Sequence, residues 1–170
     1  FCILMMRIFI AKIILLGIII VLIVLGSSFI TSWRFKLASG SSDSILFSMK
    51  SREHYDIVIL GTSHGRIFYR SGNHERVEKI LDKKIMNLSI GGGRGIYASQ
   101  IFLDYFFERG NSADTILYFI DPWVFYSAKW NEENDLFSDE PLRHDFLRFI
   151  IRKGVNFSTI ANYIKLKISW

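Results

Sequence analysis

The segment most suited to chemistry is residues 61–65, Gly-Thr-Ser-His-Gly, a turn of small residues that follows an apolar run. A serine directly after a buried strand projects its hydroxyl into the crevice at the carboxyl edge of a sheet. Its own backbone N–H, near the start of a following helix, can stabilise a developing oxyanion. These features make Ser63 a candidate nucleophile. The alternative, which the sequence leaves open, is that Ser63 only caps that helix.

A second segment, residues 87–93, reads Asn-Leu-Ser-Ile-Gly-Gly-Gly. Its glycines offer backbone N–H groups that no side chain obstructs, although glycines also serve simple turns. The segment lacks the GxGxxG spacing of dinucleotide sites and the terminal Gly-Lys-Ser/Thr of a phosphate-binding loop. The only cysteine, Cys2, lies near the N-terminus, so the rest of the chain has no thiolate to bind a metal. We expect neither a cofactor nor a metal.

Two charged or titratable residues accompany these loops. His64 adjoins Ser63, but neighbouring side chains diverge, and a base must come within about 2.6–3.2 Å of the hydroxyl. We therefore expect His64 to line the site and not to act as the base. Asp121 follows another apolar run, where it could orient a base or bind substrate. Asp-Pro is also a common turn opener, and the sequence does not separate these interpretations.

Strands and helices alternate around these residues. A short apolar run at residues 56–60 predicts a buried strand, and residues 84–89 and 115–120 predict two further strands. This order of elements, with a helix between each pair of strands, predicts an α/β fold with a doubly wound parallel sheet. In such a sheet the loops that begin at Gly61, Ser89 and Asp121 share one edge.

The predicted helices follow from apolar periodicity. Residues 73–83 predict a helix that Asn73 caps, with Val77, Ile80 and Leu81 on its inner face. A second helix opens after the glycine-rich segment and stops at Gly110. Two further helices are expected at residues 146–151 and 160–168.

The N-terminal part of the chain predicts a membrane anchor. Residues 13–30 form 18 consecutive positions without a charge, dominated by Ile, Leu and Val. A helix needs about 20 apolar residues to cross a bilayer, which favours a span over a cleavable signal peptide. We expect an anchor at residues 1–34, a juxtamembrane linker at 35–54 and an α/β domain at 55–170. Basic residues on the two sides of the span nearly balance, so charge does not fix the orientation.

Composition and charge exclude one class of partner. The 170 residues carry a formal net charge of +5, with no clustered basic face interleaved with aromatic residues. We therefore expect no nucleic-acid partner. The chain starts with Phe and stops in an apolar-periodic segment, so we expect a fragment of a longer protein.

Taken together, the two loops resemble the SGNH (GDSL-like) hydrolase superfamily, and more closely its membrane-anchored DltD-like and alginate O-acetyltransferase-like branch. Residues 61–63 are similar to the block that holds the nucleophilic serine, here Ser63. Residues 86–92 are similar to the block whose glycine donates to the oxyanion, which matches Gly92 best and Gly91 second, with Asn87 and His64 near the substrate. The resemblance covers residues 55–125 and implies a flavodoxin-like, three-layer domain.

Two departures from the superfamily pattern are visible. After the third predicted strand the family has Gly-x-Asn-Asp, whereas this chain has Asp-Pro-Trp at residues 121–123. The family's Asp-x-x-His, which supplies the catalytic base, does not occur in the 170 residues, and we expect it beyond Trp170.

The resemblance implies a membrane-tethered esterase or O-acyltransferase whose soluble domain is extracytoplasmic. Its expected partners are the lipid bilayer, an acylated cell-envelope polymer or carbohydrate as substrate, and a membrane-bound acyltransferase. The competing hypothesis is a non-catalytic SGNH-like scaffold or binding protein within a polysaccharide-modifying complex, which the missing Gly-x-Asn-Asp favours.

Overall fold

The computed structural model describes residues 6, 9–23, 26, 44–69, 72–91, 95–126 and 135–168. The chain divides into two compact units, Phe1–Ala38 and Ser39–Trp170.

The first unit contains a helix over residues 9–23 whose apolar side chains, including Ile13, Leu16 and Ile20, are exposed. The predicted membrane span falls partly on this helix, while residues 24, 25 and 27–30 of that span lie outside the described residues. Within the described ranges, no helix combines the length and the apolar character that a bilayer crossing requires.

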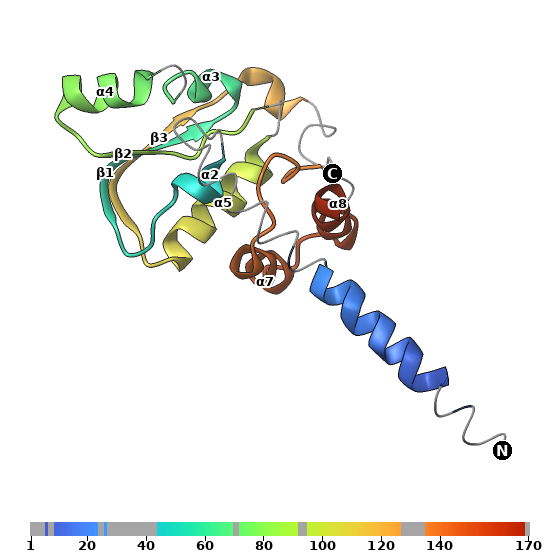
Figure 1. Ribbon diagram of the computed structural model, residues 1–170. Helices are drawn as coiled ribbons and strands as arrows, with labels where there is room; N and C mark the ends of the chain where they lie inside the picture. The colour runs from blue at the N-terminus through green and yellow to red at the C-terminus, as the bar shows by residue number, and fades with distance from the viewer. Residues whose placement is uncertain are drawn as a thin grey trace. The chain divides into compact units, whose positions relative to one another are not determined.

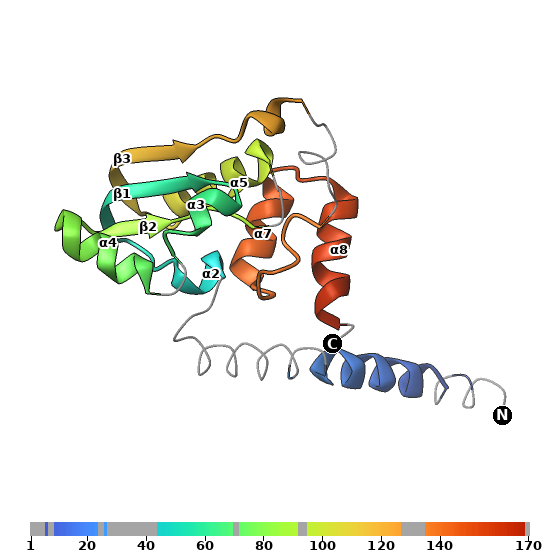
Figure 2. The ribbon, with the colours of Figure 1, turned by 90° about the horizontal axis from the view of Figure 1, so that it is seen from above.

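The second unit is built on a sheet of three parallel strands, β1 (His54–Gly61), β2 (Ile85–Asn87) and β3 (Ser112–Phe119). Their order is β2-β1-β3, so β1 lies in the middle (Figure 2). Val58 on β1 is level with Met86 on β2 and Ile116 on β3. The mixed α/β class and the parallel sheet predicted from the sequence are thereby confirmed.

Helices lie on both faces of this sheet, with α4 (Asn73–Leu81) on one side and α5 (Ile96–Glu108) on the other (Figure 1). Helix α4 has no buried residue, and Ile80 is 77% exposed. The predicted inner face of this helix is therefore wrong. The predicted cap is wrong as well, because Gly72 occupies the N-cap position and the Asn73 side chain donates instead to the Ile67 carbonyl.

The main core lies on the α5 side of the sheet, where α7 (His144–Arg152) and α8 (Phe157–Ile168) complete the packing. Phe146 of α7 is fully buried at its centre. Its ring lies 5.0–6.1 Å, centroid to centroid, from the rings of Phe102, Tyr105, Phe137, Phe149 and Tyr163. Aromatic pairs at such separations add to the stability that burial alone supplies.

A buried carboxylate fixes the first described segment of this unit. Glu140 accepts hydrogen bonds from the Ser44 hydroxyl and from the backbone N–H groups of Ile45 and Leu46, at 2.6–3.0 Å. These groups open helix α2 (Ile45–Ser48), whose N-terminal N–H groups lack partners within the helix. Ile45 and Leu46 are buried in the core, so the prediction that residues 35–54 are only a linker is wrong at these positions.

Strand β3 forms one border of the described sheet. It pairs with β1 along one side, and none of the other described strands pairs with its second side. Ile116 and Leu117, which point to opposite faces of the strand, are 46% and 45% exposed.

Asp145 joins α5 to α7 through a network of polar contacts. Its carboxylate accepts hydrogen bonds from the Tyr105 hydroxyl, at 2.9 Å, and from the guanidinium groups of Arg109 and Arg143. Partial burial raises the pKa of Asp145, but the hydrogen bonds from Arg143 and Tyr105 outweigh it and lower the pKa to about 2.

Replacing Glu140 tests the capping of α2. We expect Glu140→Ala to lower the free energy of unfolding by about 3 kcal/mol, because two buried N–H groups lose their acceptor. Urea denaturation of the purified chain measures the change. Glu75→Ala, which removes an exposed carboxylate from α4, is the control and should cost no more than about 0.5 kcal/mol. Equal losses in the two variants would contradict the capping role.

The Asp145 network predicts a pH dependence of stability. Folding lowers the pKa of Asp145 from 3.8 to about 2, so its stabilising contribution is present above pH 3.8 and disappears as the pH falls towards 2. The difference in unfolding free energy between wild type and Asp145→Asn should therefore shrink over that interval. Because the side chain is 48% exposed, the difference should stay below about 1 kcal/mol. A difference independent of pH would contradict this account.

Candidate functional site

The carboxyl ends of the three parallel strands meet at one edge of the sheet. The Leu88 N–H donates to the Ile59 carbonyl and the Ile90 N–H donates to the Gly61 carbonyl, which continues the β1–β2 pairing past Asn87. On the other side, Gly61 is level with Phe119, two residues before Asp121. The predicted meeting of these three loops at one edge is therefore confirmed.

Ser63 is the first residue of the short helix α3 (Ser63–Arg66), directly beyond β1. Its side chain is exposed, and its hydroxyl makes no hydrogen bond to any other residue that the structure describes. The N-cap of α3 is Thr62, so the alternative in which Ser63 caps the helix is wrong. The serine hydroxyl is open to molecules that approach from solvent.

Asp121 connects the loop after β3 to the loop after β1. Its carboxylate accepts a hydrogen bond from the buried Thr62 hydroxyl and lies 2.7 Å from His64 Nδ1. The Asp121 side chain is 15% exposed and the His64 ring is 68% exposed. The carbonyl of Asp121, at the N-cap of η2 (Pro122–Phe125), also accepts from the Val124 N–H. Asp121 therefore opens a turn and also orients a histidine.

Asn87 ties the end of β2 to α3. Its side-chain amide donates to the Gly65 carbonyl at 2.9 Å, and its side-chain oxygen accepts from the Ser89 N–H at 2.9 Å. The side chain is buried. Both polar ends of Asn87 thus have backbone partners, which gives this residue a positioning role at the edge.

Gly91 leaves room for an arginine. A Cβ atom at Gly91 would overlap the guanidinium of Arg66, which is buried at the end of α3. A larger residue at this position would therefore displace the end of the Arg66 side chain. Gly92, the glycine that the resemblance favours as an oxyanion donor, lies outside the described residues.

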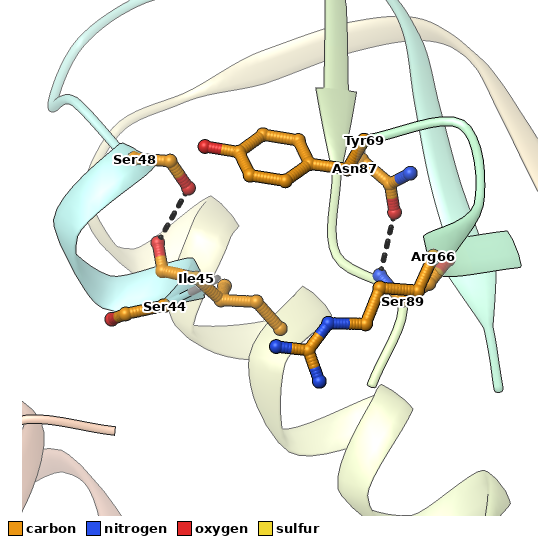
Figure 3. Close-up of a pocket in the computed structure, with 7 residues that line it drawn as sticks. All are labelled: Ser44, Ile45, Ser48, Arg66, Tyr69, Asn87 and Ser89. Carbon is orange, nitrogen blue, oxygen red and sulfur yellow. Dashed lines mark hydrogen bonds between the residues drawn. The ribbon is translucent and has the colours of Figure 1, made fainter. Parts of the chain in front are cut away.

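A small polar cavity lies behind this edge, between α2, α3 and the loop after β2. Figure 3 shows Arg66 and Tyr69 extending from the α3 side towards α2 across it. The cavity volume is about 10 Å³, which is room for one water molecule. The buried Ser89 hydroxyl lines the cavity and has no hydrogen-bond partner among the described residues. A space this small holds solvent and not a substrate.

Several residues at this edge were not singled out from the sequence. Thr62, Arg66 and Ser89 are buried polar residues of this edge, and only their position in or beside the two loops pointed to them. The four histidines of the chain are all described, and none of them hydrogen-bonds to Ser63. Within the described parts of the chain, no three His, Cys, Asp or Glu side chains gather to hold a metal ion.

Replacing Gly65 tests how closely α3 approaches the loop after β2. Helix propensity alone predicts that Gly65→Ala stabilises the protein by about 1 kcal/mol. A Cβ atom at this position would instead overlap the Ser89 hydroxyl and lie 3.1 Å from Ser89 Cβ. We therefore expect a loss of about 1–3 kcal/mol in unfolding free energy, measured by urea denaturation.

The matched control for this variant is Ser89→Ala, which removes a hydroxyl without a described partner and should be nearly neutral. Combined with Gly65→Ala, it should recover part of the lost stability. A stabilised single variant, or a double variant without recovery, would contradict the close approach.

Comparison of the chain with protein-family models, with curated proteins and with solved structures finds no match. The resemblance to SGNH hydrolases therefore rests on the two short loops alone.

Proposed function

We propose that this chain is part of a membrane-anchored SGNH-like esterase or O-acyltransferase that uses Ser63 as its nucleophile. Its substrate is an acylated carbohydrate or polymer of the cell envelope, and its soluble domain is extracytoplasmic. A membrane-bound acyltransferase is the protein partner that this function implies.

The observation that carries the proposal is the environment of Ser63. The serine lies at the carboxyl end of the central parallel strand, where ligands of doubly wound sheets bind. Its hydroxyl is exposed, and the adjacent His64 is held by Asp121. This edge therefore offers an accessible hydroxyl as a nucleophile and, one residue away in the chain, a carboxylate-oriented imidazole as a basic group.

The proposed reaction begins with attack of Ser63 Oγ on the carbonyl carbon of an ester. The serine proton passes to a general base, which the resemblance places in an Asp-x-x-His motif that these 170 residues lack. The N–H groups of Ser63 and Gly92 stabilise the oxyanion, with Gly91 as the second candidate donor. The C–O bond to the leaving alcohol then breaks, the alcohol takes up the proton, and the acyl group stays on Ser63.

The proposed domain is doubly wound and flavodoxin-like. The strand order β2-β1-β3, with helices on both faces, supports a doubly wound, flavodoxin-like domain of three layers. The exposed apolar side chains of the helix at residues 9–23 support membrane attachment through residues 13–30.

A non-catalytic scaffold is the second candidate function. It is favoured by the absence of any hydrogen bond from the described histidines to Ser63 and by the backbone partners that occupy Asn87. In this alternative the same edge binds an envelope carbohydrate without acyl transfer.

Covalent labelling separates the two functions. We expect a fluorophosphonate probe to label the full-length protein at Ser63 and not to label Ser63→Ala, because only an activated hydroxyl attacks phosphorus. In-gel fluorescence and mass spectrometry of the modified peptide measure the labelling.

The control is Ser89→Ala, which changes a buried serine at the same edge of the sheet and should leave the labelling intact. Label that persists in Ser63→Ala would eliminate Ser63 as the nucleophile. A full-length protein that takes up no label would favour the scaffold.

A further inference from the structure

The pair formed by His64 and Asp121 differs from an ordinary surface ion pair because its carboxylate is mostly buried and has a second partner. Asp121 is mostly buried, and its second carboxylate oxygen accepts the hydroxyl of Thr62, which is itself 2% exposed. The carboxylate is therefore held by the interior of the domain as well as by His64. The His64 ring, 68% exposed, lies on the solvent side of this pair.

The contact with Asp121 determines which nitrogen of the His64 ring carries the proton. A carboxylate only accepts hydrogen bonds, so Nδ1 of His64, 2.7 Å from Asp121 Oδ1, carries the proton. In the neutral ring, Nε2 is then the atom with the free lone pair. Nε2 has no hydrogen-bond partner among the described residues, so the basic nitrogen of the ring is available to an incoming molecule.

This nitrogen does not serve the hydroxyl of Ser63 directly. Consecutive residues of a helix leave the axis about 100° apart, and no hydrogen bond joins the two side chains. Both side chains are exposed at the same turn, however. Because both residues are exposed, a molecule that reaches an acyl group on Ser63 from solvent can also reach the His64 ring.

We infer that His64 is the general base for the second half of the reaction, in which the acyl group leaves Ser63; the inference rests on the function proposed above. Nε2 of His64 removes the proton from water or from an acceptor alcohol, whose oxygen attacks the acyl carbonyl carbon. The bond between that carbon and Ser63 Oγ breaks. The imidazolium returns its proton to Ser63 Oγ through a solvent water, and Asp121 keeps the ring in position.

The test uses His64→Asn in the full-length protein in detergent, with p-nitrophenyl acetate as acyl donor and water as acceptor. Asparagine places an N–H group close to the position of Nδ1, so the contact with Asp121 is kept while Nε2 is lost. We expect the burst of p-nitrophenol to stay within about twofold of wild type, and steady turnover to fall about 100-fold or more. Acetyl-Ser63 should accumulate and be visible by mass spectrometry.

The matched control is His54→Asn. His54 forms a comparable pair with Asp114, at 3.3 Å, at the opposite end of the same two strands. This variant should change neither the burst nor the turnover. As a second measurement, imidazole added after the excess p-nitrophenyl acetate is removed should speed the loss of the acetyl group from Ser63 in His64→Ala, followed by mass spectrometry, a rescue that a purely structural role would not give.

Each outcome decides between roles. Unchanged turnover in His64→Asn would show that the His64–Asp121 pair has no role in the reaction and would overturn the inference. The proposed function would not be affected by that result. Loss of the burst together with turnover would also overturn it, because His64 would then act before the acyl group is formed. A wild-type protein that never forms acetyl-Ser63 would overturn both the inference and the proposed function.

Discussion

The candidate site depends on the parallel pairing of β1 with strands on both of its sides. Because β2 and β3 both run parallel to β1, the segments after Gly61, Asn87 and Phe119 all leave the sheet at one edge. An antiparallel neighbour would have sent its following loop to the other end of the sheet. The contact between His64 and Asp121, 57 positions apart in the chain, follows from this arrangement.

Behind the exposed edge, a layer of buried polar groups holds the loops at fixed spacings. Asn87 binds α3 to the end of β2, and the side chain of Arg66 fills the space beside Gly91. Burial raises the pKa of Glu140, while the hydrogen bonds from α2 and the charge of Arg66 act in the opposite direction. Polar groups in such a layer stabilise one arrangement because the loss of any partner leaves another group unsatisfied.

The strands could be predicted from the sequence because each is a short apolar run closed by a turn residue. The exposure of the apolar face of helix α4 could not be predicted in this way. The spacing of Val77, Ile80 and Leu81 indicates an amphipathic helix, but the core lies on the opposite face of the sheet, and the apolar stripe remains mostly exposed. Periodicity shows that a helix has a face and does not show what covers it.

The candidate site was predicted in its location and not in its contacts. Ser63, His64 and Asp121 follow strands and were recognised by that position. The orientation of His64 by Asp121 depends on the order of strands in the sheet, which no local pattern contains. The burial of Ile45 and Leu46 also depends on a distant residue, because Glu140 supplies the acceptors that these positions need.

Strand β3 has a practical consequence for handling this protein. One side of its backbone has no partner among the described strands, and the apolar Ile116 and Leu117 are uncovered on its two faces. Such an edge is a template on which further chains can add and start aggregation. Purified samples will therefore stay monodisperse best at low concentration, and a lysine introduced at Thr115 or Leu117 is the first change to make for crystallisation or NMR.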